Sequence, residues 1–273
     1  MNKVAVLGSS GQIGGHLVDY LRQKDIEVDG YSISSHKTAT NIVCDLSREN
    51  LDFSKYDFVY FLAFDVGGSR YLKTYQHTSR FMNNNMRLMS NVFEELEKTK
   101  VPFIFTSSQM ANMSYSPYGL LKHLGELNTA ALNGLVVKFW NIYGIEHDLE
   151  KAHVITDFIL KAKNGMIDMM TTGEEVRQFL YADDCCECLD ILAEKYAEID
   201  REKPLHVTNF ENTSIMEVAK IISEYVPSRI VPGKLTDSVQ QDARNEPDPY
   251  IKKYWTSKTS LQEGIKKVVE SME

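Results

Sequence analysis

The stretch VAVLGSSGQIGG, residues 4–15, joins a short apolar run to a cluster of glycines. The apolar run predicts a buried strand, and apolar residues then recur at helical spacing over residues 13–21. Gly8, Gly11 and Gly14 therefore fall at the turn between a strand and a helix. Such glycines permit a tight turn, let the backbone approach a pyrophosphate, and allow the helix to pack closely on the strand. We interpret the turn as dinucleotide-binding; a glycine-rich turn of another doubly wound fold is the alternative.

Length and composition indicate the class of protein. The chain has 273 residues, 43% of them hydrophobic and 25% charged, which fits one large α/β domain or a main domain with a smaller companion. A net charge of −8 argues against a nucleic-acid partner. The apolar runs are too short for a membrane span or a signal peptide, so we expect a cytoplasmic protein with no membrane partner. Three of the four cysteines cluster at residues 185–188, in a spacing that predicts packing and no metal site.

Strand patterns alternate with helical patterns along the first half of the chain. After residues 4–8 they are IEVDGYS (26–32), TNIVCDL (40–46), YDFVYFLAF (56–64), VPFIFTSS (101–108) and GLVVKFWNIYG (134–144). A long amphipathic helix is expected over residues 78–98. This alternation predicts an α/β fold with a doubly wound parallel sheet, the Rossmann fold, which binds ligands at the carboxyl ends of its strands. We expect this dinucleotide-binding domain over residues 1–145 and a smaller α/β lobe that covers the substrate over 146–273, with chain crossings.

A second motif, SYSPYGLLKHLGE at residues 114–126, carries the chemistry. Ser116 and Pro117 suit the start of a helix, which places Tyr118 and Lys122 on one face, four residues apart. An ammonium group beside a tyrosine favours the phenolate and lowers the tyrosine's pKa. The pair could then exchange a proton with a substrate hydroxyl while a nicotinamide takes or gives a hydride. A packed tyrosine with a solvated lysine is the alternative.

These motifs, in this order, resemble the extended short-chain dehydrogenase/reductase family, in particular its nucleotide-sugar epimerases, dehydratases and reductases. Further matches are FLAFDVGG at 61–68 with the family's HLAA-x-VGG, Asn85 with its helix asparagine, FWNIYG at 139–144 with R-x-x-NVYG, EEVRQFLYADD at 174–184 with RDFIYVDD, and WTSKTSLQEGIKK at 255–267 with its closing GW-x-P-x-TSLEEGI. The resemblance covers nearly the whole chain.

The resemblance implies a nucleotide-diphosphate sugar as substrate and NAD or NADP as cofactor. The implied catalytic residues are Ser108, Tyr118 and Lys122. The implied cofactor-binding residues are Gly8, Ser10, Gly11, Gln12, Ile13, Gly14, Ser32, Asp45, Leu46, Leu62, Ala63, Tyr118 and Lys122, and the implied substrate-binding residues are Asn141, Arg177 and Arg244. Family habit further implies a homodimer formed by the helices near residues 78–98 and 118.

Three departures from the family pattern bear on the reaction. The catalytic hydroxyl is either Ser108, which we choose by counting from Phe105, or Ser107. The dehydratases carry Asp-Glu directly after it, where this chain has Gln109 and Met110, so 4,6-dehydration is disfavoured. The GDP-fucose synthases carry a cysteine where Met110 stands, which argues against their 3,5-epimerisation.

The choice between NAD and NADP stays open. NAD-specific members end the second strand with an acidic residue for the ribose 2′-hydroxyl. Here that position is Ser32, Asp29 comes too early, and His36 and Lys37 follow as groups that could bind a 2′-phosphate.

The sequence thus predicts an NAD(P)-dependent epimerase or oxidoreductase that transfers a hydride at a sugar carbon, most simply C4. The alternative is a non-catalytic dinucleotide-binding sensor or scaffold of the same superfamily. Such proteins usually lose the tyrosine or the lysine, and this chain keeps both Tyr118 and Lys122.

Overall fold

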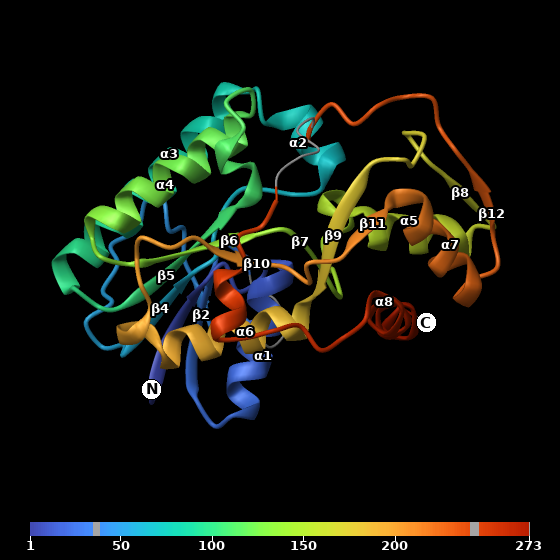
Figure 1. The fold of residues 1–273 in the computed structure, drawn as a ribbon. Helices are drawn as coiled ribbons and strands as arrows, with labels where there is room; N and C mark the ends of the chain where they lie inside the picture. The colour runs from blue at the N-terminus through green and yellow to red at the C-terminus, as the bar shows by residue number, and fades with distance from the viewer. Residues whose placement is uncertain (35–38, 241–245, 273) are drawn as a thin grey trace.

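A computed structural model describes residues 1–34, 39–240 and 246–272. Seven parallel strands form its central sheet, in the order β10-β6-β5-β4-β1-β2-β3 (Figure 1). Their bounds are β1 Lys3–Leu7, β2 Glu27–Ser32, β3 Ile42–Val43, β4 Phe58–Phe61, β5 Phe103–Ser108, β6 Leu135–Phe139 and β10 Leu205–Val207. The predicted α/β fold with a doubly wound parallel sheet is confirmed.

Helices cover both faces of this sheet because its strands are apolar on both sides. In β1, Val4 and Val6 belong to the apolar cluster under α1 (Gln12–Gln23) and α6 (Ala182–Glu194). Ala5 and Leu7 belong to the opposite cluster, under α3 (Ser79–Thr99) and α4 (Pro117–Ala131). The helix expected over residues 78–98 is α3, and Thr78 caps it by accepting a hydrogen bond from the Phe81 N–H at 3.2 Å.

The sixth predicted strand is wrong in one respect, because residues 134–144 form two strands that belong to different sheets. β6 ends at Phe139, and β7 (Asn141–Tyr143) pairs with β9 (Val176–Tyr181) of a three-stranded sheet completed by β11 (Asn212–Ser214). Between them, the Trp140 backbone N–H donates to the Val207 carbonyl at 3.3 Å. The chain leaves the central sheet at Trp140, which turns the next residue, Asn141, toward the smaller lobe.

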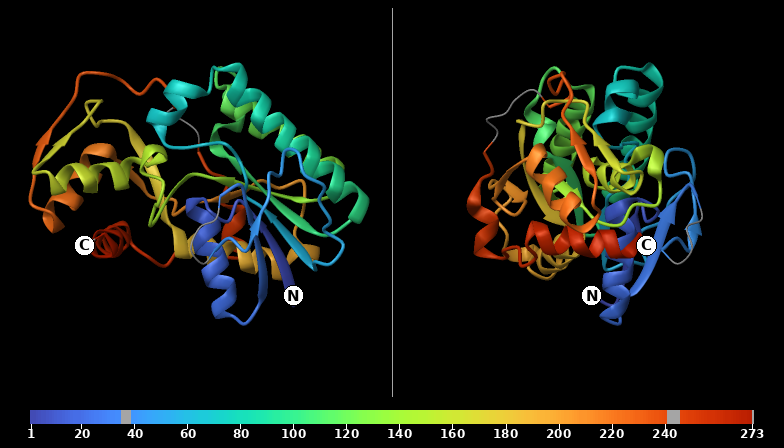
Figure 2. Two further views of the ribbon diagram at one scale, coloured as in Figure 1. Left: turned by 180° about the vertical axis from the view of Figure 1, so that it is seen from behind. Right: turned by 90° about the vertical axis from the view of Figure 1, so that its right-hand side faces the viewer.

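The smaller lobe lies beside the carboxyl ends of the central strands (Figures 1 and 2). It consists of the three-stranded sheet, a two-stranded sheet and three helices, packed around a third apolar cluster. The two-stranded sheet is formed by β8 (Met166–Asp168) and β12 (Arg229–Val231), and the helices are α5 (Val154–Lys163), α7 (Ile215–Tyr225) and α8 (Leu261–Ser271). Short helices complete the described chain: α2 Ser69–Tyr75 and the 3₁₀ turns Gln109–Asn112, Leu149–Lys151, Tyr196–Glu198 and Pro249–Lys253. The division near residue 145 stays a prediction; α6 and β10 follow it in sequence and pack on the central sheet.

The cysteine cluster lies inside the core. Cys185, Cys186 and Cys188 of α6 are fully buried among apolar residues, and burial raises the pKa of each thiol. They pack as small apolar side chains, as the spacing predicted. Of the helices that the structure describes, none is both long and apolar enough to cross a bilayer.

Carboxylates of α6 attach the closing segment of the chain to the core, and Asp184 makes the most hydrogen bonds among them. Asp184, 6% exposed, accepts hydrogen bonds from the backbone N–H groups of Lys258 and Thr259 and from the Thr259 hydroxyl, each at 2.8 Å. Ser260 and Glu263 then form a capping box that begins α8. The family's closing motif therefore has a structural reason here: it joins α8 to α6.

We predict that Asp184→Asn lowers the free energy of unfolding by about 2 kcal/mol, because it removes the charge from three short hydrogen bonds. Urea unfolding followed by circular dichroism measures the effect. Glu194→Gln, on the exposed side of the same helix, is the matched control and should stay within about 0.5 kcal/mol of wild type. Equal effects of the two substitutions would contradict this role of Asp184.

Candidate functional site

The glycine turn after β1 has no room for side chains. Gly8 has a φ of +92°, and a Cβ there would lie 2.8 Å from the backbone of Ala63. A Cβ on Gly14 would lie 2.1 Å from the carbonyl oxygen of Gly8. These two glycines therefore make the turn and bring α1 against the end of β1. Leu62 and Ala63, directly after β4, lie at the same edge, where Leu62 N–H donates to the Leu7 carbonyl at 3.0 Å.

The same turn fits a dinucleotide's pyrophosphate. Gly11 is the N-cap of α1, and the first turn of this helix holds no acidic residue. Among the described atoms, only the carbonyl oxygen of Gly8 would lie close to a Cβ added at Gly11, at 3.2 Å. In the described chain Gln12 Nε2 is buried without a hydrogen-bond partner, while Ile13 packs on the core. The backbone donors at the start of α1 and the unused amide of Gln12 suit an anionic group.

The end of β2 carries hydroxyls where a carboxylate would select NAD. The Ser32 hydroxyl, at the last position of β2, hydrogen-bonds to the Ser10 hydroxyl of the glycine turn. His36 and Lys37 lie outside the described residues. Asp45, just beyond β3, accepts hydrogen bonds from Ser47, which hold the pKa of its carboxyl below the usual range, and Leu46 beside it is buried.

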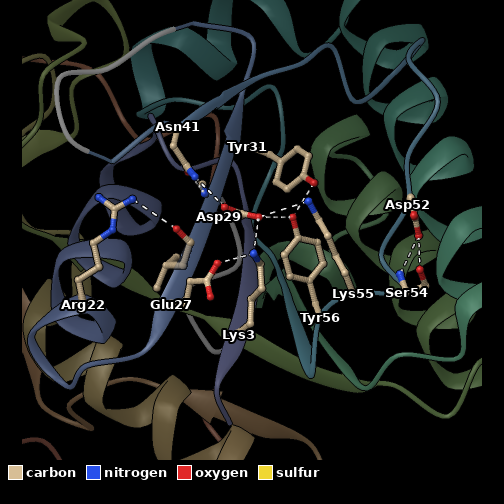
Figure 3. Close-up of polar contacts among 12 residues, drawn as sticks. Lys3, Arg22, Glu27, Asp29, Tyr31, Asn41, Asp52, Ser54, Lys55 and Tyr56 are labelled. Carbon is tan, nitrogen blue, oxygen red and sulfur yellow. Dashed lines mark hydrogen bonds and ion pairs between the residues drawn. The ribbon is translucent and has the colours of Figure 1, made fainter.

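Asp29 lies three residues before the end of β2, and its carboxylate is taken up by contacts with other side chains at the edge of the sheet (Figure 3). It accepts hydrogen bonds from the Tyr56 hydroxyl and the Asn41 amide, both at 2.7 Å, and forms ion pairs with Lys3 and Lys55. The register assigned to β2 from the sequence is therefore correct, and Asp29 serves the packing of the sheet edge.

Ser108 is the hydroxyl that meets the tyrosine. It ends β5, and burial raises the pKa of Tyr118 while the interaction with Ser108 opposes that rise. Ser107, the alternative, points elsewhere and donates to the Glu126 carboxylate. Successive residues of a strand face opposite sides, so only one of the two serines can face Tyr118.

The electrostatics of the tyrosine–lysine pair differ from the expectation that Lys122 lowers the pKa of Tyr118. Burial is the largest effect and raises the pKa of Tyr118 to about 12. Lys122 is 3% exposed, and burial lowers its own pKa to about 7. Its Nζ donates to the Thr106 carbonyl at 2.7 Å and lies 3.8 Å from the ring centroid of Phe64, but 6.0 Å from that of Tyr118. Desolvation therefore outweighs the attraction between the two groups in the protein alone.

Two neighbours of Lys122 were missed from the sequence. Phe64 packs edge to face against Tyr118, with centroids 5.7 Å apart, and covers the ammonium. Glu126, one helical turn after Lys122, acts against desolvation and raises the lysine's pKa. The Ser107 hydroxyl and Lys138 Nζ, at 3.0 Å, hold this carboxylate in place. The spacing of four residues between Lys122 and Glu126 was a usable signal, because such pairs meet on a helix.

The residues expected at the substrate lie on the side of the smaller lobe. Asn141, the first residue of β7, accepts a hydrogen bond from Gln109 at 3.4 Å. Arg177, in β9, is buried and paired with Asp237. Arg244 lies outside the described residues. Asn85, fully buried in α3, bonds to both backbone groups of Asp65 and so fixes the loop after β4.

The parallel sheet and its glycine turn define a Rossmann-type protein. Residues 4–208 match the model of the NAD dependent epimerase/dehydratase family, and the chain belongs to this family. It is 20% identical to UDP-glucuronic acid decarboxylase 1 of Xenopus tropicalis over 98% of this chain and 71% of that protein. Two solved structures share the fold. A UDP-glucose 4-epimerase of Thermotoga maritima, solved with UDP-glucose, has a TM-score of 0.82 at 22% identity, covering 99% of this chain and 98% of that one. The enzyme WbmF of Bordetella bronchiseptica, solved with NAD⁺, has 0.81 at 19%, covering 98% and 92%.

We predict that Glu126→Gln lowers the pKa of Lys122 below about 7, because the substitution removes the negative charge that opposes desolvation. NMR titration of the lysine ε-resonances measures this value directly, with Lys122→Arg identifying the signal. His123→Gln is the matched control, since His123 lies 3.4 Å from the same carboxylate and is half exposed. An unchanged pKa in Glu126→Gln would show that the carboxylate has no influence on the lysine.

Proposed function

We propose that this protein is an NAD-dependent enzyme that transfers a hydride at C4 of a nucleotide-diphosphate sugar, as an epimerase or a reductase. The observation that carries the proposal is the meeting of Ser108, Tyr118 and Lys122 at the end of β5 and the start of α4, with Ser108 close enough to Tyr118 to act on its pKa. Family membership and relatives that act on UDP-sugars support it.

The roles of the three side chains follow from their chemistry. Ser108 donates a hydrogen bond to the reacting sugar oxygen and orients it toward Tyr118. In the oxidation direction the Tyr118 phenolate takes the proton of that oxygen and becomes the hydroxyl; in the reduction direction the hydroxyl gives the proton to the sugar oxygen and becomes the phenolate. Lys122, when protonated, stabilises the phenolate. The nicotinamide of a bound dinucleotide supplies the hydride acceptor and donor. Because Tyr118 alone has a pKa of about 12, proton removal depends on positive charge beside it, which makes the protonation state of Lys122 decisive.

Dehydration is not part of the proposal. Gln109 and Met110 follow Ser108, and both are buried in the 3₁₀ turn after β5. An amide and a thioether cannot act as the acid and base that removal of water across C5–C6 requires. The Gln109 amide instead bonds to Asn141, at the side of the site where we place the sugar and its phosphates.

NAD is the cofactor that the family description supports. The glycine turn would hold its pyrophosphate through the N-terminus of α1 and Gln12, and the Ser10–Ser32 hydroxyls would face its adenosine ribose. Incubation with NAD and NADP against a panel of UDP-, GDP-, dTDP- and CDP-sugars tests both cofactor and substrate. Isomerised product without net cofactor change identifies an epimerase, and stoichiometric consumption of reduced cofactor identifies a reductase.

We predict that Tyr118→Phe reduces kcat by about a thousandfold and leaves dinucleotide affinity unchanged, because it removes the hydroxyl that exchanges the proton. Turnover is followed by NMR, and dinucleotide binding by fluorescence titration. Tyr115→Phe, three residues earlier and 40% exposed, is the control and should keep full activity. Full turnover by Tyr118→Phe would refute the assignment, and no turnover by the wild type with dinucleotide bound would favour a sensor.

We further propose that the protein is a homodimer joined through α3 and α4, which pack side by side on one face of the sheet (Figures 1 and 2). Apolar side chains are exposed along these helices: Leu120, Leu124 and Leu127 of α4 at 50%, 43% and 57%, and Met86 of α3 at 41%. A second copy of the same helix pair would bury this stripe as a four-helix bundle.

We predict that Leu124→Glu converts the dimer to a monomer, because a charge in the middle of the stripe would be buried unpaired in the bundle. Sedimentation velocity at micromolar concentration measures the state. Leu149→Glu, at an equally exposed leucine away from these helices, should leave the dimer intact. A wild-type protein that sediments as a monomer would contradict the interface.

A further inference from the structure

The arginine expected to bind the substrate's diphosphate already holds a carboxylate. Arg177 of β9 has 5% of its side chain exposed, and its Nη2 lies 2.6 Å from Asp237 Oδ2. Among the described residues, the guanidinium also donates to the carbonyl oxygens of Gln240, at 3.2 Å, and Val176, at 2.7 Å. A carboxylate and two carbonyls thus take the hydrogen bonds that a phosphate would accept from the same group.

The segment that carries Asp237 spans the two lobes. After β12 the chain runs from the smaller lobe across to the main lobe near α2 (Figures 1 and 2). Val239, 4% exposed, is inserted in the apolar cluster of the main lobe, against which Phe64 and Tyr118 also pack. The pairing of Asp237 with Arg177 therefore fastens this segment to β9, while Val239 fastens it to the main lobe.

The carboxylate of Asp237 is held in a fixed orientation. Its Oδ1 accepts hydrogen bonds from the backbone N–H groups of Val239, at 2.8 Å, and Gln240, at 3.2 Å, which leaves Oδ2 for Arg177. At 17% exposure, the Asp237 side chain is more open to solvent than the 5% exposed arginine. The carboxylate is therefore the member of the pair that solvent reaches more readily.

We infer that Asp237 is an affinity-setting residue: it competes with the substrate's diphosphate for Arg177, and it fastens its own segment to β9 until a diphosphate displaces it. The inference rests on the proposed nucleotide-sugar substrate. It follows from three facts together, namely a buried guanidinium, its pairing with an anion from a crossing segment, and the insertion of Val239 of that segment in the main-lobe apolar cluster against which Tyr118 also packs.

The competition has a physical consequence for specificity. Removing an anion from a buried arginine costs several kcal/mol unless another anion takes its place. A diphosphate offers two charged groups and bidentate acceptors, so it repays the cost, whereas a neutral sugar does not. The ion pair therefore excludes uncharged sugars and weakens the binding of the correct ligand by the free energy needed to break it.

The test measures binding of UDP and GDP as probes, by isothermal titration calorimetry on the full-length protein loaded with NAD. Asp237→Asn removes the charge, while its Oδ1 still accepts the hydrogen bonds from Val239 and Gln240. We expect Kd for the better probe to fall by about fivefold or more. Asp237→Ser, which keeps a hydroxyl to cap the turn, should give the same gain and guards against a folding defect in the first variant.

Two controls isolate the competition. Glu174→Gln makes the same change of charge three residues before Arg177, on an exposed side chain, and should leave Kd within about twofold of wild type. In an Arg177→Gln background, Asp237→Asn should have no effect on Kd, because the group for which the two anions compete is absent.

The outcomes separate this inference from the proposed function. Unchanged or weaker binding by both Asp237 variants, or a gain that persists in Arg177→Gln, overturns it. Failure of both probes to bind the variants overturns it as well. If the wild-type enzyme turns over a nucleotide sugar and the variants show no gain, this inference alone fails. If the variants bind more tightly and no nucleotide sugar is turned over, the proposed reaction alone fails.

Discussion

The close contact between the backbones of Gly8, Gly14 and Ala63 is the constraint on which the functional site depends. A Cβ at Gly8 would collide with Ala63, and one at Gly14 with the carbonyl of Gly8. With glycine at both positions, the end of β1, the end of β4 and the N-terminus of α1 converge at one point of the sheet edge. The hydroxyls of β5 and the helix that follows them then face this point, because parallel strands end at a common edge.

Desolvation governs the chemistry at that edge. Burial raises the pKa of Tyr118 and lowers that of Lys122, so both groups favour their neutral forms in the protein alone. Phe64 covers the Lys122 ammonium and adds to the exclusion of water. Glu126, held by Ser107 and Lys138, opposes the effect of burial on the pKa of Lys122. Lys122, with a pKa of about 7, is the poised member of the pair, because a modest change of nearby charge can move a proton on or off it, and its charge in turn bears on Tyr118.

The smaller lobe meets the main lobe through charged and polar contacts as well as through apolar packing. Asp184 fastens the closing motif to α6, and the pair of Asp237 with Arg177 fastens the crossing segment to β9. The first contact joins backbone groups and serves the fold. The second joins two side chains near the catalytic cluster and is, by our inference, replaceable by ligand. The difference lies in the donors: a ligand diphosphate can accept the hydrogen bonds of the Arg177 guanidinium in place of Asp237, whereas the donors to Asp184 belong to the closing motif that Asp184 fastens to the fold.

The sequence by itself determined the alternation of strands and helices along the first half of the chain. It also determined the glycine turn and the helix that carries Tyr118 and Lys122. These depend on local periodicity, backbone sterics and spacings of a few residues, which a sequence displays directly. The tertiary structure alone decided the break between β6 and β7 at Trp140, the entry of β10 into the central sheet, the contact of Phe64 with Lys122 and the pairing of Arg177 with Asp237. It also reversed the expected effect on the pKa of Tyr118. Each of these depends on burial or on contact between residues far apart in the chain, and neither is encoded in any short stretch of residues.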